Sequence, residues 1–451
     1  MTTLPARRTL PPKRGGLIAA IVVGAIAIGT AVPTILHYYG PWASDSSASA
    51  STGLTVPGFG NRVAADPNIE KLQKRVKDQP NDFVSEISLA NAYLQKVREV
   101  GDPTYYTKAE EVLALAAKAQ PGDGELFASQ GILALGRHDF ARALTLGKQA
   151  LAIDNERARY YGVVSDAQIE LGDYEGAINN LQEMVNRKPD FASFSRVAYA
   201  RELTGDPEGA IEAMQTAIEA GSSVPENLAW AHVQIGNLQF NLGQYDAADK
   251  EYALALGQFA NYATALGGQG QVAAARGDLD RAKDLYTQAF DRIPLSTFAI
   301  ALGDIAAKQG DTATAQRQYG LVRSLDKLYT ANGQNTDLEL ALFFADHKLS
   351  LDEALQRARA GYAARPSIHG ADVLAWTLYQ SGKPREAQQY ATESLKLGSR
   401  DPLLLFHAGM IAKANGDAAS AKEMLGFVAA TNPRFSLLFA DDAAAALKEL
   451  S

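Results

Sequence analysis

The chain has 451 residues, of which 47% are hydrophobic and 21% are charged, and this composition is that of a folded protein longer than one compact core. Its net charge of −8 argues against a general nucleic-acid binder, because phosphate binding requires clustered Lys and Arg. The absence of cysteine excludes disulfides, thiolate zinc sites and a cysteine nucleophile, and leaves the redox compartment open.

The amino-terminal residues have the pattern of a membrane anchor. Residues 1–14 form a basic tail without acidic residues, and residues 15–36 carry no charge. At a rise of 1.5 Å per residue this stretch spans roughly 33 Å, enough to cross a hydrocarbon core. Aromatic residues follow at once, where an interfacial belt would lie. We therefore expect one transmembrane helix over residues 15–37, with the tail in the cytoplasm and the rest of the chain on the outer side of a bacterial inner membrane, in the periplasm.

Two features of this segment leave alternatives open. Small residues at 29–31 and 48–50 could instead be cleavage sites of a signal peptide, which would release a secreted protein. The pairs Ala20/Gly24 and Ala25/Gly29 have the spacing that lets two anchors self-associate, although small residues are also simply tolerated in lipid. Residues 38–67 are rich in Ser, Ala, Gly and Pro, and we expect a flexible tether there.

Residues 68–433 are organised as repeats of one helix pair, most clearly in Tyr262–Pro294. Two apolar-striped segments, 262–275 and 279–292, flank the turn Arg276-Gly277-Asp278, in which glycine ends one helix and aspartate caps the next. Similar turns recur at intervals of 33, 38, 34, 33, 72 and 34 residues, the longest being two units with a degenerate turn near 346–348. These turns are at Gly172, Gly205, Gly243, Gly277, Gly310, Gly382 and Gly416. A period near 34 predicts a solenoid of helix-turn-helix units, because one pair cannot bury its apolar stripe alone.

These units resemble the tetratricopeptide repeat family. Its small residue in the first helix matches Ala90, Gly131, Ala198, Gly236, Gly270, Gly303, Ala375 and Gly409. Its alanine in the second helix matches Ala109, Ala143, Ala177, Ala210, Ala248, Ala282, Ala315, Ala354, Ala387 and Ala421. Its closing proline matches Pro121, Pro189, Pro294, Pro366 and Pro433. The resemblance implies an all-α, right-handed superhelical solenoid of about ten units, and residues 434–451 would form its capping helix.

The chain departs from the family pattern at three places. The tryptophan of the family is missing at its usual place in every unit, and the first unit has an enlarged turn around residues 96–108. Between the seventh and eighth units, residues 324–337 add about five residues, and Leu342 then stands where a small residue is expected. This divergent region is either a functional insertion or a repeat that has lost the consensus residues of the family.

Sequence patterns that resemble enzyme motifs lie in a structural setting that does not suit the chemistry, so we expect no catalytic residues and no cofactor. The glycine pattern at 268–270 has a dinucleotide-type spacing but lies inside a predicted helix with no strand before it. A competing hypothesis is a metal-handling or catalytic site in segment 325–372, built from Asp337, Glu339, Asp346, His347, His369 and Asp372. Their spacing lacks a ligand signature, and we expect no metal site.

The resemblance implies binding of a protein or peptide in a concave groove lined by first helices. The groove residues expected on this basis are Arg159, Asp166, Tyr199, Trp230, Asn237, Phe240, Asp304, His369, Asp372, Trp376, Tyr379 and Phe406. Aromatic side chains on such a wall suit hot-spot contacts, although packing between units would use them equally well. The expected role is a membrane-anchored scaffold or adaptor for other proteins, with assembly of an envelope complex as its setting.

Overall fold

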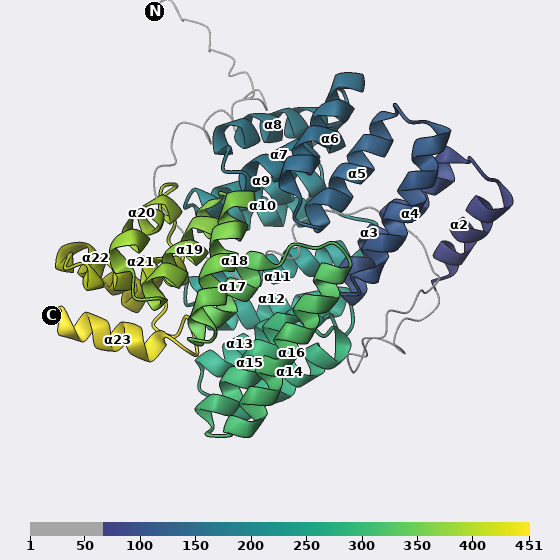
Figure 1. The fold of residues 1–451 in the computed structure, drawn as a ribbon. Coiled ribbons are helices and arrows are strands. Elements are labelled where there is room, and N and C mark those ends of the chain that lie inside the picture. Colours follow the sequence, from purple (N-terminus) through teal and green to yellow (C-terminus); the bar gives the residue numbers. More distant parts are fainter. Residues whose placement is uncertain (1–65) are drawn as a thin grey trace, which may run out of the picture.

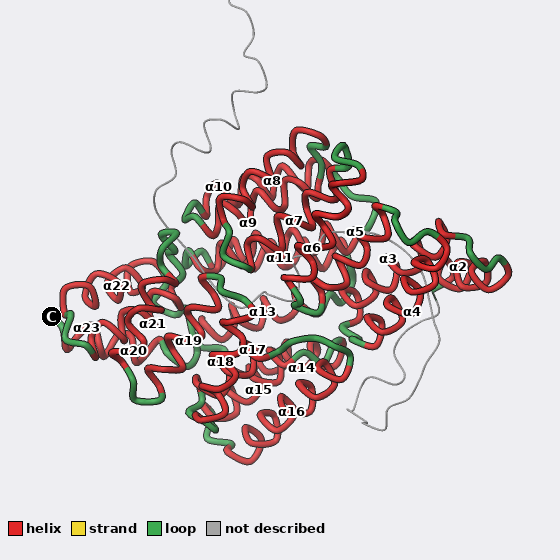
Figure 2. The backbone as a smooth tube through the Cα atoms, turned by 45° about the horizontal axis from the view of Figure 1, so that its top comes forward, coloured by secondary structure: helices red, strands yellow, loops and turns green. Residues whose placement is uncertain are grey.

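The computed structural model describes residues 66–451, which form 22 helices, α2 to α23, with no strand among these residues (Figures 1 and 2). Helix α2 (Pro67–Asp78) leads into ten helix pairs, and α23 (Ala440–Glu449) follows them. The predicted all-α repeat solenoid is confirmed. The expected basic tail, transmembrane helix and tether lie outside the described residues, except for the last two tether residues, Asp66 and Pro67, of which Pro67 begins α2. Within residues 66–451, no helix is both long enough and apolar enough to cross a membrane.

Each pair forms one unit, and the units are numbered 1 to 10 along the chain. They are α3 (Phe83–Val100) with α4 (Thr104–Ala119), α5 (Gly124–Gly136) with α6 (Phe140–Ile153), α7 (Ala158–Glu170) with α8 (Tyr174–Arg187), α9 (Phe191–Leu203) with α10 (Pro207–Ala220), α11 (Pro225–Asn241) with α12 (Tyr245–Gln258), α13 (Ala263–Ala275) with α14 (Leu279–Arg292), α15 (Ser296–Lys308) with α16 (Thr312–Ala331), α17 (Asp337–Asp346) with α18 (Leu351–Ala364), α19 (Ile368–Gln380) with α20 (Pro384–Ser394), and α21 (Pro402–Ala414) with α22 (Ala418–Thr431).

The unit boundaries follow from local chemistry. Aspartate side chains cap ten of the helices by accepting a hydrogen bond from a backbone N–H of the first turn, which that turn cannot satisfy internally. These caps are Asp82, Asp123, Asp139, Asp173, Asp190, Asp206, Asp278, Asp311, Asp401 and Asp417. All seven predicted turn glycines have positive φ, the conformation that glycine adopts without steric cost. In unit 8, where the turn was expected to be degenerate, Lys348 and Ser350 take positive φ instead.

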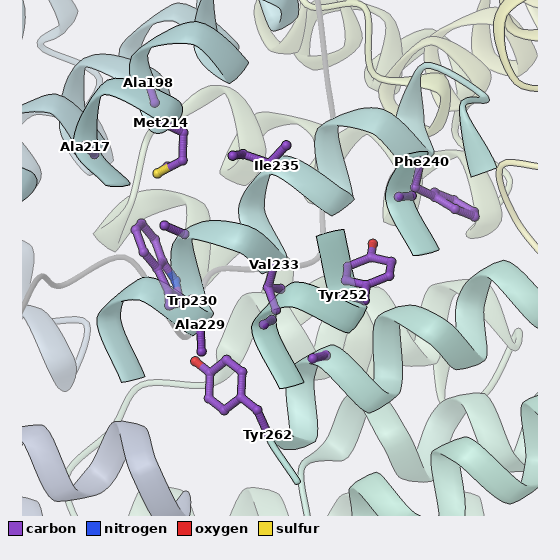
Figure 3. Close-up of a cluster of buried hydrophobic side chains, with 14 of the residues drawn as sticks. Ala198, Met214, Ala217, Ala229, Trp230, Val233, Ile235, Phe240, Tyr252 and Tyr262 are labelled. Carbon is purple, nitrogen blue, oxygen red and sulfur yellow. The ribbon is translucent and has the colours of Figure 1, made fainter. Parts of the chain in front are cut away.

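The glycines of α13 are spacers for aromatic rings. A Cβ atom on Gly268 would lie 2.4 Å from the ring of Tyr252, and one on Gly267 would lie 2.5 Å from the ring of Phe298. Tyr252 is fully buried in the core cluster around Trp230 (Figure 3). A Cβ atom on Gly270 would lie 3.0 Å from the ring of Tyr286 in α14, so the dinucleotide-like spacing of Gly268 and Gly270 is explained by close packing of α13 against α12 and α14.

We expect Gly268→Ala to lower the free energy of unfolding by about 1–3 kcal/mol, because the buried ring of Tyr252 has no room to move away from a new methyl group. The matched control is Gly257→Ala in α12, where nothing lies within 4 Å of the new Cβ atom. This control should stabilise the protein by about 0.5–1 kcal/mol through helix propensity. Urea unfolding of both variants measures the difference, and equal effects of the same sign would contradict the spacer role.

The solenoid winds back on itself, so that each unit of the first half contacts the unit five places later. We call units 1–5 (α3–α12) the first layer, units 6–10 (α13–α22) the second layer, and the contact between them the seam. At the seam, the turn inside unit n meets the chain segment that ends unit n+5. The pairings are Gly101 with Ile293 and Leu295, Arg137 and His138 with Asn332 and Asn335, Gly172 and Tyr174 with Pro366 and Ile368, Glu208 with Arg400, and Gly243 and Tyr245 with Thr431 and Asn432.

The segments that connect one unit to the next are buried in the second layer and exposed in the first. Residues Ile293, Leu295, Arg365, Asp401 and Asn432, which end units of the second layer, are all buried. The corresponding segments of the first layer, such as 120–122 and 155–157, are exposed. A solenoid without a seam would expose both sets alike, because each unit would contact only its neighbours.

The divergent region before unit 8 contributes to the seam. Helix α16 is extended to 20 residues, and its Tyr329 hydroxyl donates to the backbone oxygen of Gly101 at 3.1 Å. In the loop that follows, the amide of Asn335 donates to the backbone oxygen of Arg137 at 3.0 Å. The Arg137 side chain in turn donates to the backbone oxygen of Asn332 at 3.0 Å. The extra residues thus join the second layer to units 1 and 2.

Candidate functional site

All twelve residues expected in the groove lie on first helices, the layer in which successive first helices contact one another. They are distributed over units 3, 4, 5, 7, 9 and 10 and do not form a single patch. Tyr199, Asn237 and Tyr379 are half-buried. Contact of any of the twelve with a partner stays a prediction.

The two charged groove residues of unit 3, Arg159 and Asp166, form ion pairs with residues of units 2 and 4. The Arg159 guanidinium pairs with Glu125 and donates to the Asn91 amide oxygen at 2.8 Å. Arg196 donates two hydrogen bonds to Asp166, each 2.8 Å long. Burial raises the pKa of Asp166, and the nearby Arg196 acts in the opposite direction. Both pairs join neighbouring first helices, and the bidentate Arg196–Asp166 pair in particular fixes the geometry of this wall.

The aromatic members of unit 5, Trp230 and Phe240, are packed between units in this structure. Trp230 and Phe240 are each 2% exposed, and Trp230 lies in the core cluster with Met214 and Tyr262 (Figure 3). Asn237 accepts a hydrogen bond from the Tyr252 hydroxyl at 2.9 Å. In this conformation these aromatic side chains stabilise the array, which was the alternative to partner contact.

A chain of buried Asp, His and aromatic side chains runs through units 7 to 10. Asp304 accepts from the Tyr319 hydroxyl at 2.8 Å and lies 2.7 Å from the His347 Nε2 atom. Burial lowers the pKa of His347, but its hydrogen bond to Asp304 and the charge of that carboxylate outweigh burial, so the pKa is raised.

The second part of this chain surrounds Trp376. The Trp376 Nε1 donates to Asp346 at 2.8 Å, and the indole stacks on His407 with ring centres 4.1 Å apart. His407 in turn contacts the Asp372 carboxylate through Nδ1 at 3.0 Å. Phe406, another expected groove residue, is 1% exposed in the same cluster. Burial raises the pKa of Asp346 to about 7, although the nearby His407 and His347 oppose this shift.

His369 is the member of this region whose titration should be most visible. It is 8% exposed, and burial lowers its pKa to about 4, with Glu170, Arg365 and Asp372 as the charged neighbours. An unfolded histidine has a pKa of about 6.5. Between these two values the unfolded chain binds a proton that the folded chain does not. Stability contributed by neutral His369 is therefore lost as pH falls from about 6.5 to about 4.

We expect the wild type to lose about 2 kcal/mol more stability than His369→Gln between pH 7 and pH 4.5, because glutamine does not titrate. Asp346→Asn provides a comparison of opposite sign. The pKa of Asp346 is raised, so the wild type should lose stability relative to this variant as pH rises from about 4 to about 7. Urea unfolding across this pH range measures both. Parallel curves for wild type and His369→Gln would contradict the expectation.

The six residues of the metal hypothesis do not converge on one point. Asp337 pairs with Arg357, Glu339 with Arg365, and His347 with Asp304, whereas Asp346 and Asp372 accept from Trp376 and His407. Within residues 66–451, no group of three or more His, Asp or Glu side chains is arranged to hold a metal ion. Metal analysis of the purified protein tests the hypothesis directly.

Two buried charge clusters were missed at the sequence level. Glu226 is fully buried and accepts from Gln95, Arg98 and the Tyr262 hydroxyl, which connects unit 1 with units 5 and 6. Arg365 pairs with Glu170 across the seam and lies over the Phe140 ring at 5.4 Å. Neither cluster has a local sequence signal, because Glu226 is 131 residues from Gln95 and Arg365 is 195 residues from Glu170 in the chain.

Comparison with known proteins gives one family. A family model described as tetratricopeptide repeat matches residues 165–225 and 233–299. No curated protein matches. Similar solved structures include the thermophilic protein TTC0263 of Thermus thermophilus, which is 21% identical, with coverage of 40% of this chain and 98% of that one and a TM-score of 0.36. PilF of Pseudomonas aeruginosa is 19% identical, covering 51% of this chain and 100% of that one, with a TM-score of 0.36. The human IFIT1 dimer is 13% identical, covering 80% and 85%, with a TM-score of 0.45.

The matched residues include most of units 3 to 6, and the same pair of helices continues through the other units, with a capping aspartate in units 1, 2, 7 and 10. Residues 165–225 and 233–299 are therefore tetratricopeptide repeats, and the other units share their architecture of paired helices.

Proposed function

We propose that the protein is a scaffold that binds an extended segment of another protein along its first helices. The observation that carries this proposal is the placement of arginine, acidic and aromatic side chains on the first helices of six units in a tetratricopeptide repeat array. Arginine and aromatic residues are the types that dominate binding energy at protein interfaces. The paired carboxylates, such as Asp166 and Glu125, already accept from arginine and can exchange these bonds with a partner.

The scaffold is placed, in this proposal, on the outer side of a bacterial inner membrane. The support is the uncharged stretch of residues 15–36 after a basic tail, followed by the Ser-, Ala-, Gly- and Pro-rich residues 38–67. Assembly of an envelope complex is the setting that this location favours. No step of the proposal requires catalysis by the chain itself.

Site-specific photocrosslinking in cells tests the binding surface. A photoreactive phenylalanine analogue at Tyr379, which is half-buried on first helix α19, should give a discrete adduct with a partner. The matched control replaces Leu254, which is 42% exposed on second helix α12. Equal adducts at both positions, or none at Tyr379 and at a second first-helix position such as Asn237, would contradict the proposal.

Fractionation tests the location separately. An intact amino terminus in the membrane fraction is expected for an anchored protein, and its mass distinguishes this from cleavage after about residue 31 or 50. A processed chain found only in the soluble fraction would favour the secreted alternative, without affecting the binding surface.

A further inference from the structure

We infer that the seam is a clasp: a polar, loop-based joint that opens and recloses while the ten units remain folded, and so controls access to the first helices. The inference goes beyond the scaffold role, because it concerns a motion of the fold that exists whether or not a partner is present. Its consequence for binding rests on the proposed function.

The first argument is the chemistry of the seam compared with that of the unit interfaces. Every helix pair with extensive contacts joins helices within a unit or in adjacent units. Among the described helices, such pairs connect the two layers only where the chain passes from unit 5 to unit 6, with α13 packed against α11 and α12. At the seam itself, the layers are joined by side chains and loops. Tyr174 accepts from the amide of Ile368 at 2.7 Å, the Asn335 amide donates to Arg137, and Asn432 donates to the backbone oxygen of Phe240 at 2.7 Å.

Apolar burial at the seam is small. One cluster spans it, formed by Ile169 and Leu203 with Ile368. Between consecutive units, by contrast, the helices are joined by large clusters such as that around Trp230 and Tyr252. Hydrogen bonds exchange readily with water and contribute little net stability each, whereas apolar burial is the dominant stabilising term. The joint that breaks first is therefore the seam, and relative motion of two bodies is the default where their interface is small and polar.

The second argument is that the closed state is specific, as a clasp requires. A Cβ atom on Gly172 would lie 2.6 Å from the Pro366 backbone oxygen, and one on Gly243 would lie 2.4 Å from that of Thr431. The equivalent turn glycines of the second layer, among them Gly277 and Gly382, have nothing within 4 Å. The turns at Gly172 and Gly243 are therefore shaped for close approach to a backbone, and those at Gly277 and Gly382 are not.

The residue that starts the second helix shows the same asymmetry. In units 3 and 5 it is a tyrosine, Tyr174 or Tyr245, whose hydroxyl bonds to the opposite layer. In units 6 and 10 the same position holds Leu279 and Ala418, and these units have exposed turns. The turn residues that make seam contacts are therefore found in the first layer and not in the exposed turns of the second layer. For this reason the two layers rejoin in one alignment only.

Opening of the clasp is measured by hydrogen exchange of the full-length protein without any partner. The reporters are the amides of Asn335 and Ile368, which donate across the seam. Both should exchange at least 100-fold faster than the amides of α11, because their exchange requires opening of the seam and not unfolding of a unit. Exchange of Asn335, Ile368 and α11 at one common rate, set by global unfolding, would overturn the inference.

A disulfide lock provides the decisive variant, and the cysteine-free chain makes it unambiguous. A Cβ atom on Gly101 lies 3.5 Å from that of Ile293, within the range that a disulfide requires. Oxidised Gly101→Cys/Ile293→Cys should slow exchange of Asn335 at least tenfold, and reduction should restore it. The matched control is Gly409→Cys/Met424→Cys, also 3.5 Å apart but within unit 10, which should leave Asn335 exchange unchanged. Equal slowing by both disulfides would contradict a seam-specific motion.

If the disulfide variant does not fold, removal of a single hydroxyl group tests the same motion of the seam. Tyr174→Phe removes one seam hydrogen bond and no helix packing, and we expect about fivefold faster exchange of Ile368. Tyr362→Phe is its control, because this hydroxyl bonds to Glu393 in the adjacent unit and not across the seam. No change in Tyr174→Phe, or the same change in both, would count against the clasp.

A separate measurement tests whether opening of the seam controls binding of a partner. In cells, the oxidised lock should reduce the Tyr379 photocrosslink at least tenfold, and the control disulfide should not. If the oxidised lock slows hydrogen exchange of Asn335 but leaves the Tyr379 crosslink unchanged, the seam opens as inferred but does not control access to the first helices. Absence of any crosslink in every form would count against the proposed function and leave the exchange result standing.

Discussion

Replacing Glu170 with alanine is expected to lower the free energy of unfolding by about 3–5 kcal/mol, because it leaves the buried Arg365 guanidinium without its main partner. The side chains are only 9% and 4% exposed, and the remaining carboxylate, Glu339, lies at 3.5 Å from Arg365. A charge in this position cannot recover its hydration without opening the seam between units 3 and 8. Urea unfolding of Glu170→Ala measures the loss.

Two comparison variants make this result specific. Glu353→Ala removes an acidic partner of Arg323 at the surface, where the side chains are 36% and 45% exposed, and should cost less than about 1 kcal/mol. The double variant Glu170→Leu/Arg365→Met removes both charges, and we expect it to recover much of the lost stability. A loss in Glu170→Ala no larger than in Glu353→Ala would show that the seam ion pair is not buried in solution.

Replacing Trp376 with alanine is expected to cost about 3–5 kcal/mol, because the indole is 1% exposed and joins unit 9 to unit 10 and to the capping segment. It contacts Phe406 and Phe439 with ring centres 5.6 and 5.5 Å away. The cavity would leave α23 without part of its docking surface. Thermal and urea unfolding report the loss, and limited proteolysis near residue 439 reports release of the cap.

Two further variants separate packing from hydrogen bonding. Trp376→Phe retains an aromatic ring but removes the donor to Asp346, and we expect a cost of about 1–3 kcal/mol. Val84→Ala alters a large apolar side chain that is 70% exposed and should change stability by less than about 0.5 kcal/mol. If Trp376→Ala proved as mild as Val84→Ala, the indole would be available to a partner and not committed to packing.

The helix pairs could be read from the sequence because their signals are local. The unit of Tyr262–Pro294 contains its own apolar stripe, its turn glycine with φ of +84° and the capping Asp278, all within 33 residues. Each signal acts on backbone atoms a few residues away, so one unit suffices to predict the next. Even the departure at unit 8 was located correctly, although its turn uses Lys348 and Ser350.

The candidate site was less predictable from the same information. Periodicity assigns Trp230, Trp376 and Phe406 to first helices, and the structure confirms that placement. It does not say whether such a side chain faces a groove or a neighbouring unit, and here all three are buried. A large aromatic residue satisfies either role, so side-chain type alone does not separate them.

The sequence by itself determined that this protein is a solenoid of ten helix pairs, because capping, turn geometry and apolar periodicity are properties of short segments. Only the tertiary structure decided that the array closes on itself five units later. That closure depends on small rotations accumulated over many unit interfaces and on contacts such as Glu170 with Arg365, which are 195 residues apart. No local sequence pattern specifies the accumulated rotation of the units, so the contacts of the seam can be identified only in the complete superhelix.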